Sequence, residues 1–168
     1  MNLLKEILDA LLKPDFSFTT ELGSGYSQEE DEAQKRLLVL RYARAQLGKP
    51  YKLGAEVNPG DEPTLLDCSE LVQCAYRDGA GLDCVDGCIY QQAQFHRVKS
   101  PQPGDLIFLG PSVKGTRHVM IVSGPGLVIH AKGGVGVIEE SDHAYTTSPR
   151  FQGYFRYPDF ARKPEDRA

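Results

Sequence analysis

The chain changes character near residue 101, and this change constrains the possible folds more than any other feature. Before it, apolar residues recur at helical spacing over residues 1–13, 27–47, 65–76 and 88–94. After it, short apolar runs separated by glycine and proline are typical of β-strands, at residues 106–109, 118–123, 127–131, 135–140 and 151–157. Helices followed by antiparallel strands predict an α+β fold, with N-terminal helices packed on a central antiparallel sheet of about five strands.

Two of these helices carry boundary signals. Ser27 and Glu30 form a capping-box pattern, and Gly48 ends the helix that follows. The inward face of this helix is expected to hold Ala33, Leu37, Leu40, Ala43 and Leu47. Asp86 is the candidate cap of the last short helix. Residues 51–64 are rich in glycine and proline, and we expect them to form a loop that walls a cleft over the helix of residues 65–76.

Composition argues against several kinds of partner. The 168 residues are enough for one compact domain, and the formal net charge is -4. Lysine and arginine are scattered without a run, so we expect no nucleic-acid partner and no binding to anionic membranes. No apolar stretch approaches the roughly 20 residues that a bilayer span requires. We therefore expect a soluble protein.

We divide the chain into an N-terminal helix and connector (1–26), a folded domain (27–160) and a charged tail (161–168). Lys5, Glu6 and Asp9 interrupt the apolar stripe of the first helix, so it does not match the core of a secretory signal. An amphipathic helix is the better interpretation, and it can dock onto its own domain, a second copy or another protein. Without a signal peptide, the expected location is the cytoplasm.

The helix over residues 65–76 places a cysteine where its chemistry can be activated. Cys68 shares one helix face with Leu71, Val72 and Ala75, and Asp67 just before it is a good N-cap. Glu70 can reach back to the Asp67 N–H and complete a capping box. Free backbone N–H groups and the positive end of the helix dipole then favour the thiolate form of Cys68. The alternative is that Cys68 only packs in the core.

Two histidines lie on a predicted β-hairpin. His118 begins the strand at 118–123, and His130 closes the strand at 127–131 across a Gly124-Pro125-Gly126 turn. For the two rings to stand side by side by direct pairing, the hairpin needs an odd loop of three or five residues. With that register, His118 can take the proton of Cys68 while His130 holds the His118 ring in the useful tautomer. Taken singly, each histidine is more often structural.

The other cysteines give no clear metal signature. Cys68, Cys74, Cys84 and Cys88 are expected to be reduced thiols, because the chain lacks a secretion signal. Cys84 and Cys88 with His96 match no zinc spacing. We therefore expect no metal and no cofactor.

Five separate motifs resemble those of the NlpC/P60 cysteine peptidases. They span residues 34–140, in the family's order and with family-like spacing: Gly48-Lys49-Pro50-Tyr51, Asp67-Cys68-Ser69, Pro103-Gly104-Asp105-Leu106-Ile107-Phe108, the His118 strand and Ile129-His130-Ala131. The resemblance implies a papain-like core, with the cysteine on a helix and the histidines on an antiparallel sheet. It also implies a substrate, the stem peptides of peptidoglycan or muropeptides, cut after D-γ-glutamyl and before the diamino acid.

The resemblance also implies roles for single residues. Cys68 matches the nucleophile, His118 the general base and His130 the third polar residue of a Cys-His-His triad. Tyr51 matches a tyrosine whose hydroxyl can help to hold the oxyanion. Asp67 and Ser69 match residues that receive the free amine of the stem peptide in some members, although helix capping explains them equally well. Gln91 or Gln92 can line the cleft or simply be surface residues.

Two departures from the family pattern leave alternatives open. Glu70 stands where the family usually has glycine, and its charge would either oppose the Cys68 thiolate or read a cationic substrate group. The chain also lacks a cell-wall-binding repeat. In this it resembles a phage tail peptidase carried in the virion, or an enzyme that acts on muropeptides in the cytoplasm. The alternatives are an inactive structural component with phage tail partners, and a related amidase or acyltransferase. In the permuted branch of the superfamily the histidine precedes the cysteine. Here the cysteine comes first, which disfavours the amidase or acyltransferase.

Overall fold

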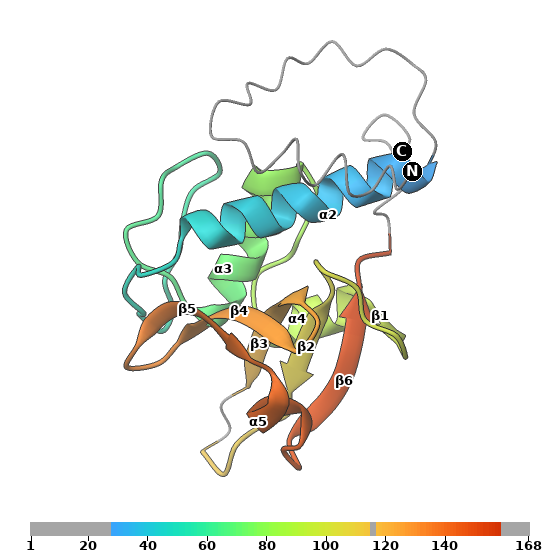
Figure 1. Cartoon of the computed structure of the whole chain (residues 1–168). Helices are drawn as coiled ribbons and strands as arrows, with labels where there is room; N and C mark the ends of the chain where they lie inside the picture. The colour runs from blue at the N-terminus through green and yellow to red at the C-terminus, as the bar shows by residue number, and fades with distance from the viewer. Residues whose placement is uncertain (1–27, 115–116, 159–168) are drawn as a thin grey trace.

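A computed structural model describes residues 28–114 and 117–158 of the protein. The described chain forms a six-stranded antiparallel sheet with the order β1-β6-β2-β3-β4-β5 (Figure 1). The strands are β1 (His96–Val98), β2 (Leu106–Leu109), β3 (His118–Gly124), β4 (Leu127–Lys132), β5 (Gly136–Ser141) and β6 (Phe151–Arg156). The predicted α+β fold is confirmed, and all five predicted strands are present. The sixth, β1, has only three residues and no apolar alternation to reveal it.

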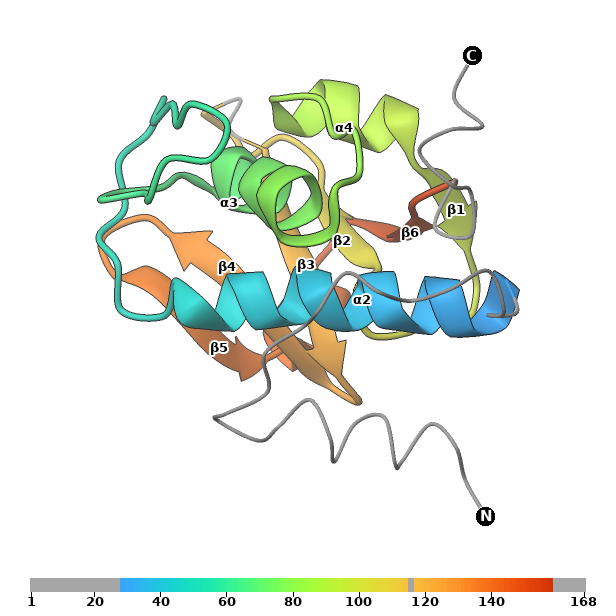
Figure 2. The same cartoon turned by 90° about the horizontal axis from the view of Figure 1, so that it is seen from above.

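The helices are α2 (Gln28–Ala45), α3 (Cys68–Cys74), α4 (Cys88–Gln94) and the short α5 (His143–Thr146), which the sequence pattern did not predict. In both views α3 lies between α2 and α4 (Figures 1 and 2). Helix α3 packs against β3 and β4, so it rests on the middle of the sheet. None of the helices in residues 28–114 and 117–158 has the length and apolar character of a membrane span.

The helix predicted over residues 65–76 begins at Cys68 and extends to Gly79, with a wider last turn. After Cys74 the chain continues as a π-helical segment, η1 (Ala75–Gly79), which packs along α2. A Cβ atom at Gly79 would lie 2.7 Å from Tyr42 Cβ and 3.1 Å from the Leu38 carbonyl oxygen. Glycine is therefore needed here for the close approach of η1 to α2.

The predicted inward face of α2 is only partly correct. Leu40 and Ala43 are buried as expected, but Leu47 is 42% exposed. The buried face is turned toward Val39 and two charged residues, Lys35 and Arg36. A pattern based on apolar residues misses this rotation, because Lys35 is paired with Asp31 and Arg36 with Glu32. The predicted Ser27 cap, the N-terminal helix with its connector, and the tail lie outside the described residues.

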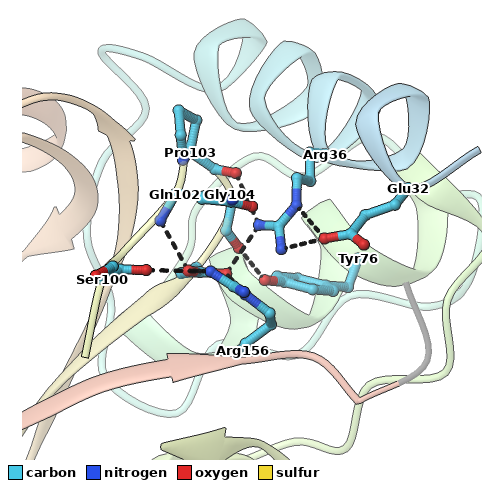
Figure 3. Close-up of polar contacts among 9 residues, drawn as sticks. Glu32, Arg36, Tyr76, Ser100, Gln102, Pro103, Gly104 and Arg156 are labelled. Carbon is cyan, nitrogen blue, oxygen red and sulfur yellow. Dashed lines mark hydrogen bonds and ion pairs between the residues drawn. The ribbon is translucent and has the colours of Figure 1, made fainter. Parts of the chain in front are cut away.

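Arg36 belongs to a buried ionic cluster that joins α2 to the sheet. Figure 3 shows Arg36 from α2 and Arg156 from β6 converging on the Gln102–Gly104 turn. The Asp105 carboxylate, fully buried, accepts hydrogen bonds from Arg36 Nη1 at 2.8 Å and from Arg156 Nη2 at 2.9 Å. The Gln102 N–H donates to the same carboxylate at 2.8 Å. The Asp105 charge is therefore paired and saturated, and it fixes the turn that precedes β2.

Loss of the Asp105 carboxylate should destabilise the protein strongly. Asp105→Ala would leave two cationic side chains facing a buried, unpaired site, which typically costs about 3–5 kcal/mol of unfolding free energy. Urea unfolding measures this loss. Glu62→Ala is the matched control, because Glu62 pairs with Lys49 but its side chain is 79% exposed, so a change within about 0.5 kcal/mol is expected. Equal effects of the two substitutions would contradict the assignment.

Candidate active site

The N-cap of α3 is built as the sequence predicts. Asp67 Oδ1 accepts hydrogen bonds from the Glu70 N–H at 2.9 Å and from the Ser69 hydroxyl at 3.0 Å. Asp67 Oδ2 accepts a third, from the Gly54 N–H at 2.9 Å. The cap thus fixes the start of α3 and also holds the 51–64 loop against it. Cys68 is the first residue of the helix, at the positive end of its dipole.

Glu70 does not complete the predicted capping box. Its Oε1 accepts hydrogen bonds from the Val57 N–H at 2.9 Å and from the Cys74 thiol at 3.5 Å. The carboxylate therefore anchors the 51–64 loop instead of the backbone at Asp67. Burial raises the pKa of Glu70. The hydrogen bonds to the Glu70 carboxylate come from Val57 and Cys74, so the glutamate that departs from the family pattern serves the loop.

A second thiol lies next to Cys68. Cys88 begins α4, and its Sγ is 3.6 Å from the Cys68 Sγ. The hydrogen bond from Cys88 makes the largest contribution to lowering the pKa of the Cys68 thiol well below its usual range. Burial opposes this effect, and His118 reinforces it. Burial raises the pKa of Cys74 to about 12 and raises that of Cys84 as well. The pKa of Cys88 is raised as well, so Cys68 is the one of the four thiols whose pKa is lowered.

The two histidines share one face of the sheet, but not by the direct pairing that the sequence predicts. The hairpin turn has two residues, and a bulge between Val122 and Gly124 shifts the register of β3 against β4. Beyond the bulge Ile121 pairs with Ile129, which makes His118 a diagonal neighbour of His130. The prediction of an odd-length loop was wrong, because the bulge supplies the extra residue instead.

The imidazole rings nevertheless make close contact. His118 Nε2 lies 2.6 Å from His130 Nδ1, and the ring centroids are 4.9 Å apart. On the far side, His130 Nε2 lies 2.9 Å from Glu140 Oε1. The same oxygen accepts hydrogen bonds from the Lys132 ammonium and the Tyr145 hydroxyl. A continuous polar chain therefore runs from Glu140 through His130 to His118, and His118 interacts with Cys68.

The charges along this chain determine its tautomers. Burial works against the ionised form of Glu140, but the hydrogen bonds from Lys132, Tyr145 and His130 lower its pKa to about 2. An ionised carboxylate only accepts, so His130 Nε2 must carry a proton. Burial and the nearby His118 lower the pKa of His130 to about 4, which keeps this ring neutral near pH 7. His130 Nδ1 is then an acceptor and requires a proton on His118 Nε2, so Nδ1 is the His118 nitrogen that can accept a proton from Cys68.

The other predicted site residues also lie close to α3. Tyr51 forms an isolated bridge with Leu66, and burial, followed by the charges of Cys68 and Asp67, raises the pKa of its hydroxyl. Ser69 is buried and donates to Asp67. Gln91 is fully buried, where its amide nitrogen donates to the Ser69 carbonyl at 2.9 Å, so it joins α4 to α3. Gln92 is half-buried.

Sequence reasoning missed Cys88, Glu140, Lys132 and Tyr145. No local motif surrounds them. The register of β5 against β4 brings Glu140 to the site, the packing of α4 on α3 brings Cys88, and hydrogen bonds to Glu140 bring Lys132 and Tyr145. Asp86 was the wrong cap for α4, because Gly87 occupies the N-cap and Asp86 accepts the Gly87 N–H. In residues 28–114 and 117–158, no three His, Cys, Asp or Glu side chains form a group that could hold a metal ion.

Comparisons with known proteins agree with this geometry. The NlpC/P60 family matches residues 48–155. Among solved structures, NlpC1 from Trichomonas vaginalis has a TM-score of 0.61 at 21% identity and covers 85% of this chain. The peptidoglycan hydrolase RipB from Mycobacterium tuberculosis has a TM-score of 0.61 at 23% identity. The match covers 90% of this chain and 77% of the RipB chain.

The NlpC/P60 domain of the peptidoglycan hydrolase SagA has a TM-score of 0.55 at 27% identity. The match covers 72% of this chain and 97% of the SagA domain. The chain spans 48% of NlpC1, about half its length. A comparison with curated proteins finds no match. At these identities, NlpC1 and RipB show a shared fold.

The buried neutral His130 should make stability depend on pH. Its pKa falls from 6.5 to about 4 on folding, so the unfolded chain binds more protons between these values. Stability contributed by neutral His130 is present above pH 6.5 and is lost as the pH falls toward 4, by up to about 3 kcal/mol. Urea unfolding of the wild type and of His130→Gln over this range tests this, and the variant should show the weaker pH dependence.

Exposed His96 supplies the control for this experiment. His96→Gln should keep the pH dependence of the wild type, because the His96 side chain lies on the surface. A wild-type stability that stays flat between pH 6.5 and 4 would contradict the assignment of a buried neutral ring.

Proposed function

Because the chain belongs to the NlpC/P60 family, we propose that it is a cysteine peptidase that hydrolyses the stem peptides of peptidoglycan. One observation carries this proposal. The Cys68 thiol at the start of α3 has a lowered pKa and interacts with His118, and a chain of hydrogen bonds runs from His118 through His130 to Glu140. SagA and RipB, two of the structural neighbours, are peptidoglycan hydrolases, which supports the substrate class.

In the proposed reaction, the Cys68 thiolate attacks the carbonyl carbon of the scissile amide. The carbonyl electrons move to oxygen, and the Cys68 N–H and the Tyr51 hydroxyl are the candidate donors to this oxyanion. Tyr51 can act as a donor because its raised pKa keeps the hydroxyl protonated. When the C–N bond breaks, protonated His118 gives its proton to the leaving amine, and Cys68 retains the acyl group as a thioester.

Water completes the cycle by attack on the thioester. His118, neutral again, removes a proton from that water, and the thiolate leaves as the carboxylic acid product forms. His130 keeps His118 in the orientation and tautomer that both half-reactions need. Glu140 fixes His130 in turn, so a charge that sequence reasoning missed supports the base.

The proposed bond is the one between D-γ-glutamate and the diamino acid, as the family resemblance implies. Asp67 and Ser69 remain candidates for binding the free amine of the preceding alanine. The Asp67 carboxylate already accepts three protein hydrogen bonds, so its cap and loop contacts would have to persist when an amine binds. Stem peptides with a free and with an acetylated N-terminus separate the amine-binding role from the capping role.

Mass spectrometry of defined stem peptides and purified muropeptides, incubated with reduced protein, tests the proposal. Cleavage after D-γ-glutamate is expected. Cys68→Ala should reduce the rate by at least about a thousandfold, because no other group supplies the nucleophile. Cys74→Ala is the matched control, since Cys74 lies on the same helix with a raised pKa and should have little effect on the rate.

Two results would count against the peptidase. Absence of cleavage by reduced wild type would favour a structural component, and cleavage at a sugar-linked amide would favour an amidase. Cleavage that survives in Cys68→Ala would exclude Cys68 as the nucleophile.

A further inference from the structure

The proposed mechanism needs one thiol, yet the structure places two in contact. Cys68 Sγ and Cys88 Sγ are 3.6 Å apart, whereas a disulfide bond is about 2.05 Å long. A movement of roughly 1.5 Å would bring the sulfur atoms to bonding distance. Each cysteine is the first residue of its helix, α3 or α4, where the backbone on one side belongs to a loop.

The contact between these helix ends is held by specific bonds. The fully buried Gln91 side chain donates to the Ser69 carbonyl at 2.9 Å and to the Val85 carbonyl at 3.0 Å. These two bonds tie the first turn of α4 to the first turn of α3 and to the loop before α4. Cys88 is therefore kept beside Cys68 by the packing of the fold.

The two thiols differ in reactivity and access. Cys68 is the thiol that ionises readily, whereas its proximity to Cys68 and burial raise the pKa of Cys88. Cys88 is half-buried, and the next two residues, Ile89 and Tyr90, are exposed. Cys68 is the more buried of the two, but peroxide reacts with the thiolate form, so a small oxidant would react first at Cys68. The protonated Cys88 thiol then lies next to the oxidised sulfur.

We infer that Cys88 is a resolving cysteine, which converts peroxide-oxidised Cys68 into a reversible Cys68–Cys88 disulfide. The Cys68 thiolate attacks the terminal oxygen of a hydroperoxide, forming an S–O bond while the O–O bond breaks. The leaving alkoxide or hydroxide takes up a proton from protonated His118 or solvent and departs as an alcohol or water. The Cys88 sulfur then attacks the Cys68 sulfenic acid. The S–S bond forms, and the S–O bond breaks and releases water that carries the Cys88 proton.

Return to the active form requires a dithiol reductant, which is oxidised to its own disulfide as both cysteines regain their protons. The predicted consequence for activity rests on the proposed function, because the disulfide removes the nucleophile. The disulfide also protects Cys68 from irreversible oxidation to the sulfinic acid.

The other two cysteines serve as internal controls. Cys74 is fully buried and bonded to Glu70, and Cys84 is buried with its thiol toward the Val85 carbonyl. Burial raises the pKa of each, so neither should react with peroxide at the rate of Cys68. The cross-link should therefore be specific to the pair in contact.

The test treats the reduced full-length protein with a small excess of hydrogen peroxide and maps the thiols by mass spectrometry. Trypsin separates residues 53–77 from 78–97, so the expected disulfide joins these two peptides with a loss of about 2 Da. Cys74→Ala and Cys84→Ala should still form this cross-link. Peptidase activity should fall as the cross-link forms and return with dithiothreitol.

Cys88→Ser is the decisive variant, because serine keeps a hydroxyl donor beside Cys68 but cannot form a disulfide. The activity of this variant is compared with its own activity before treatment. Peroxide should inactivate it, and dithiothreitol should not restore the activity. Cys68 should gain about 32 Da as the sulfinic acid. Recovery equal to that of the wild type, or a wild-type cross-link through Cys74 or Cys84, would overturn the proposal.

The mass readout keeps this proposal separate from the proposed function. A Cys68–Cys88 disulfide in a protein that cleaves no stem peptide would support the resolving role and refute the peptidase. Cleavage by a protein in which peroxide yields no such disulfide would refute the resolving role alone.

Discussion

The candidate site depends on a shift of one residue in the pairing of β3 with β4. At the turn Gly124 pairs with Leu127, a register that would place His118 and His130 on opposite faces of the sheet. The bulge before Gly124 changes the register, so that Ile121 pairs with Ile129 and the two histidines share a face. The contact between the two rings, and with it the line from Glu140 to Cys68, follows from this local irregularity.

The rest of the fold serves to hold this line against α3. The Asp67 cap and the Glu70 carboxylate bind the backbone of the 51–64 loop, and Gln91 binds α4 to α3. On the other side of the core, the buried Asp105 joins α2, the turn before β2, and β6. Buried polar and charged groups that are saturated by partners therefore fix the positions of elements whose apolar surfaces alone would allow sliding.

Sequence reasoning predicted the features that depend on local patterns. The α+β class, the Asp67 cap, the bounds of α4 and the position of β2 follow from spacing and from end signals that act within a few residues. The contact between His118 and His130 was also anticipated, although for the wrong geometric reason. The resemblance to the NlpC/P60 family rested on five short motifs, and the family match supports it.

The features that the sequence did not reveal depend on distant pairing. Glu140 is brought to His130 by the register of β5, and Cys88 to Cys68 by the packing of α4. Arg36 was not among the residues expected on the inward face of α2, because its buried partner Asp105 lies 69 residues away in the sequence. Burial of a charge cannot be inferred from spacing when the group that compensates it is unknown.

The protonation of the two imidazole rings tests the central claim most directly, and nitrogen-detected NMR of the histidine side chains near pH 7 reports it. We expect a neutral His130 with its proton on Nε2, and a proton on His118 Nε2. A His130 ring with its proton on Nδ1 would contradict this arrangement, because that nitrogen could not accept a hydrogen bond from His118, and Glu140 would not orient the base.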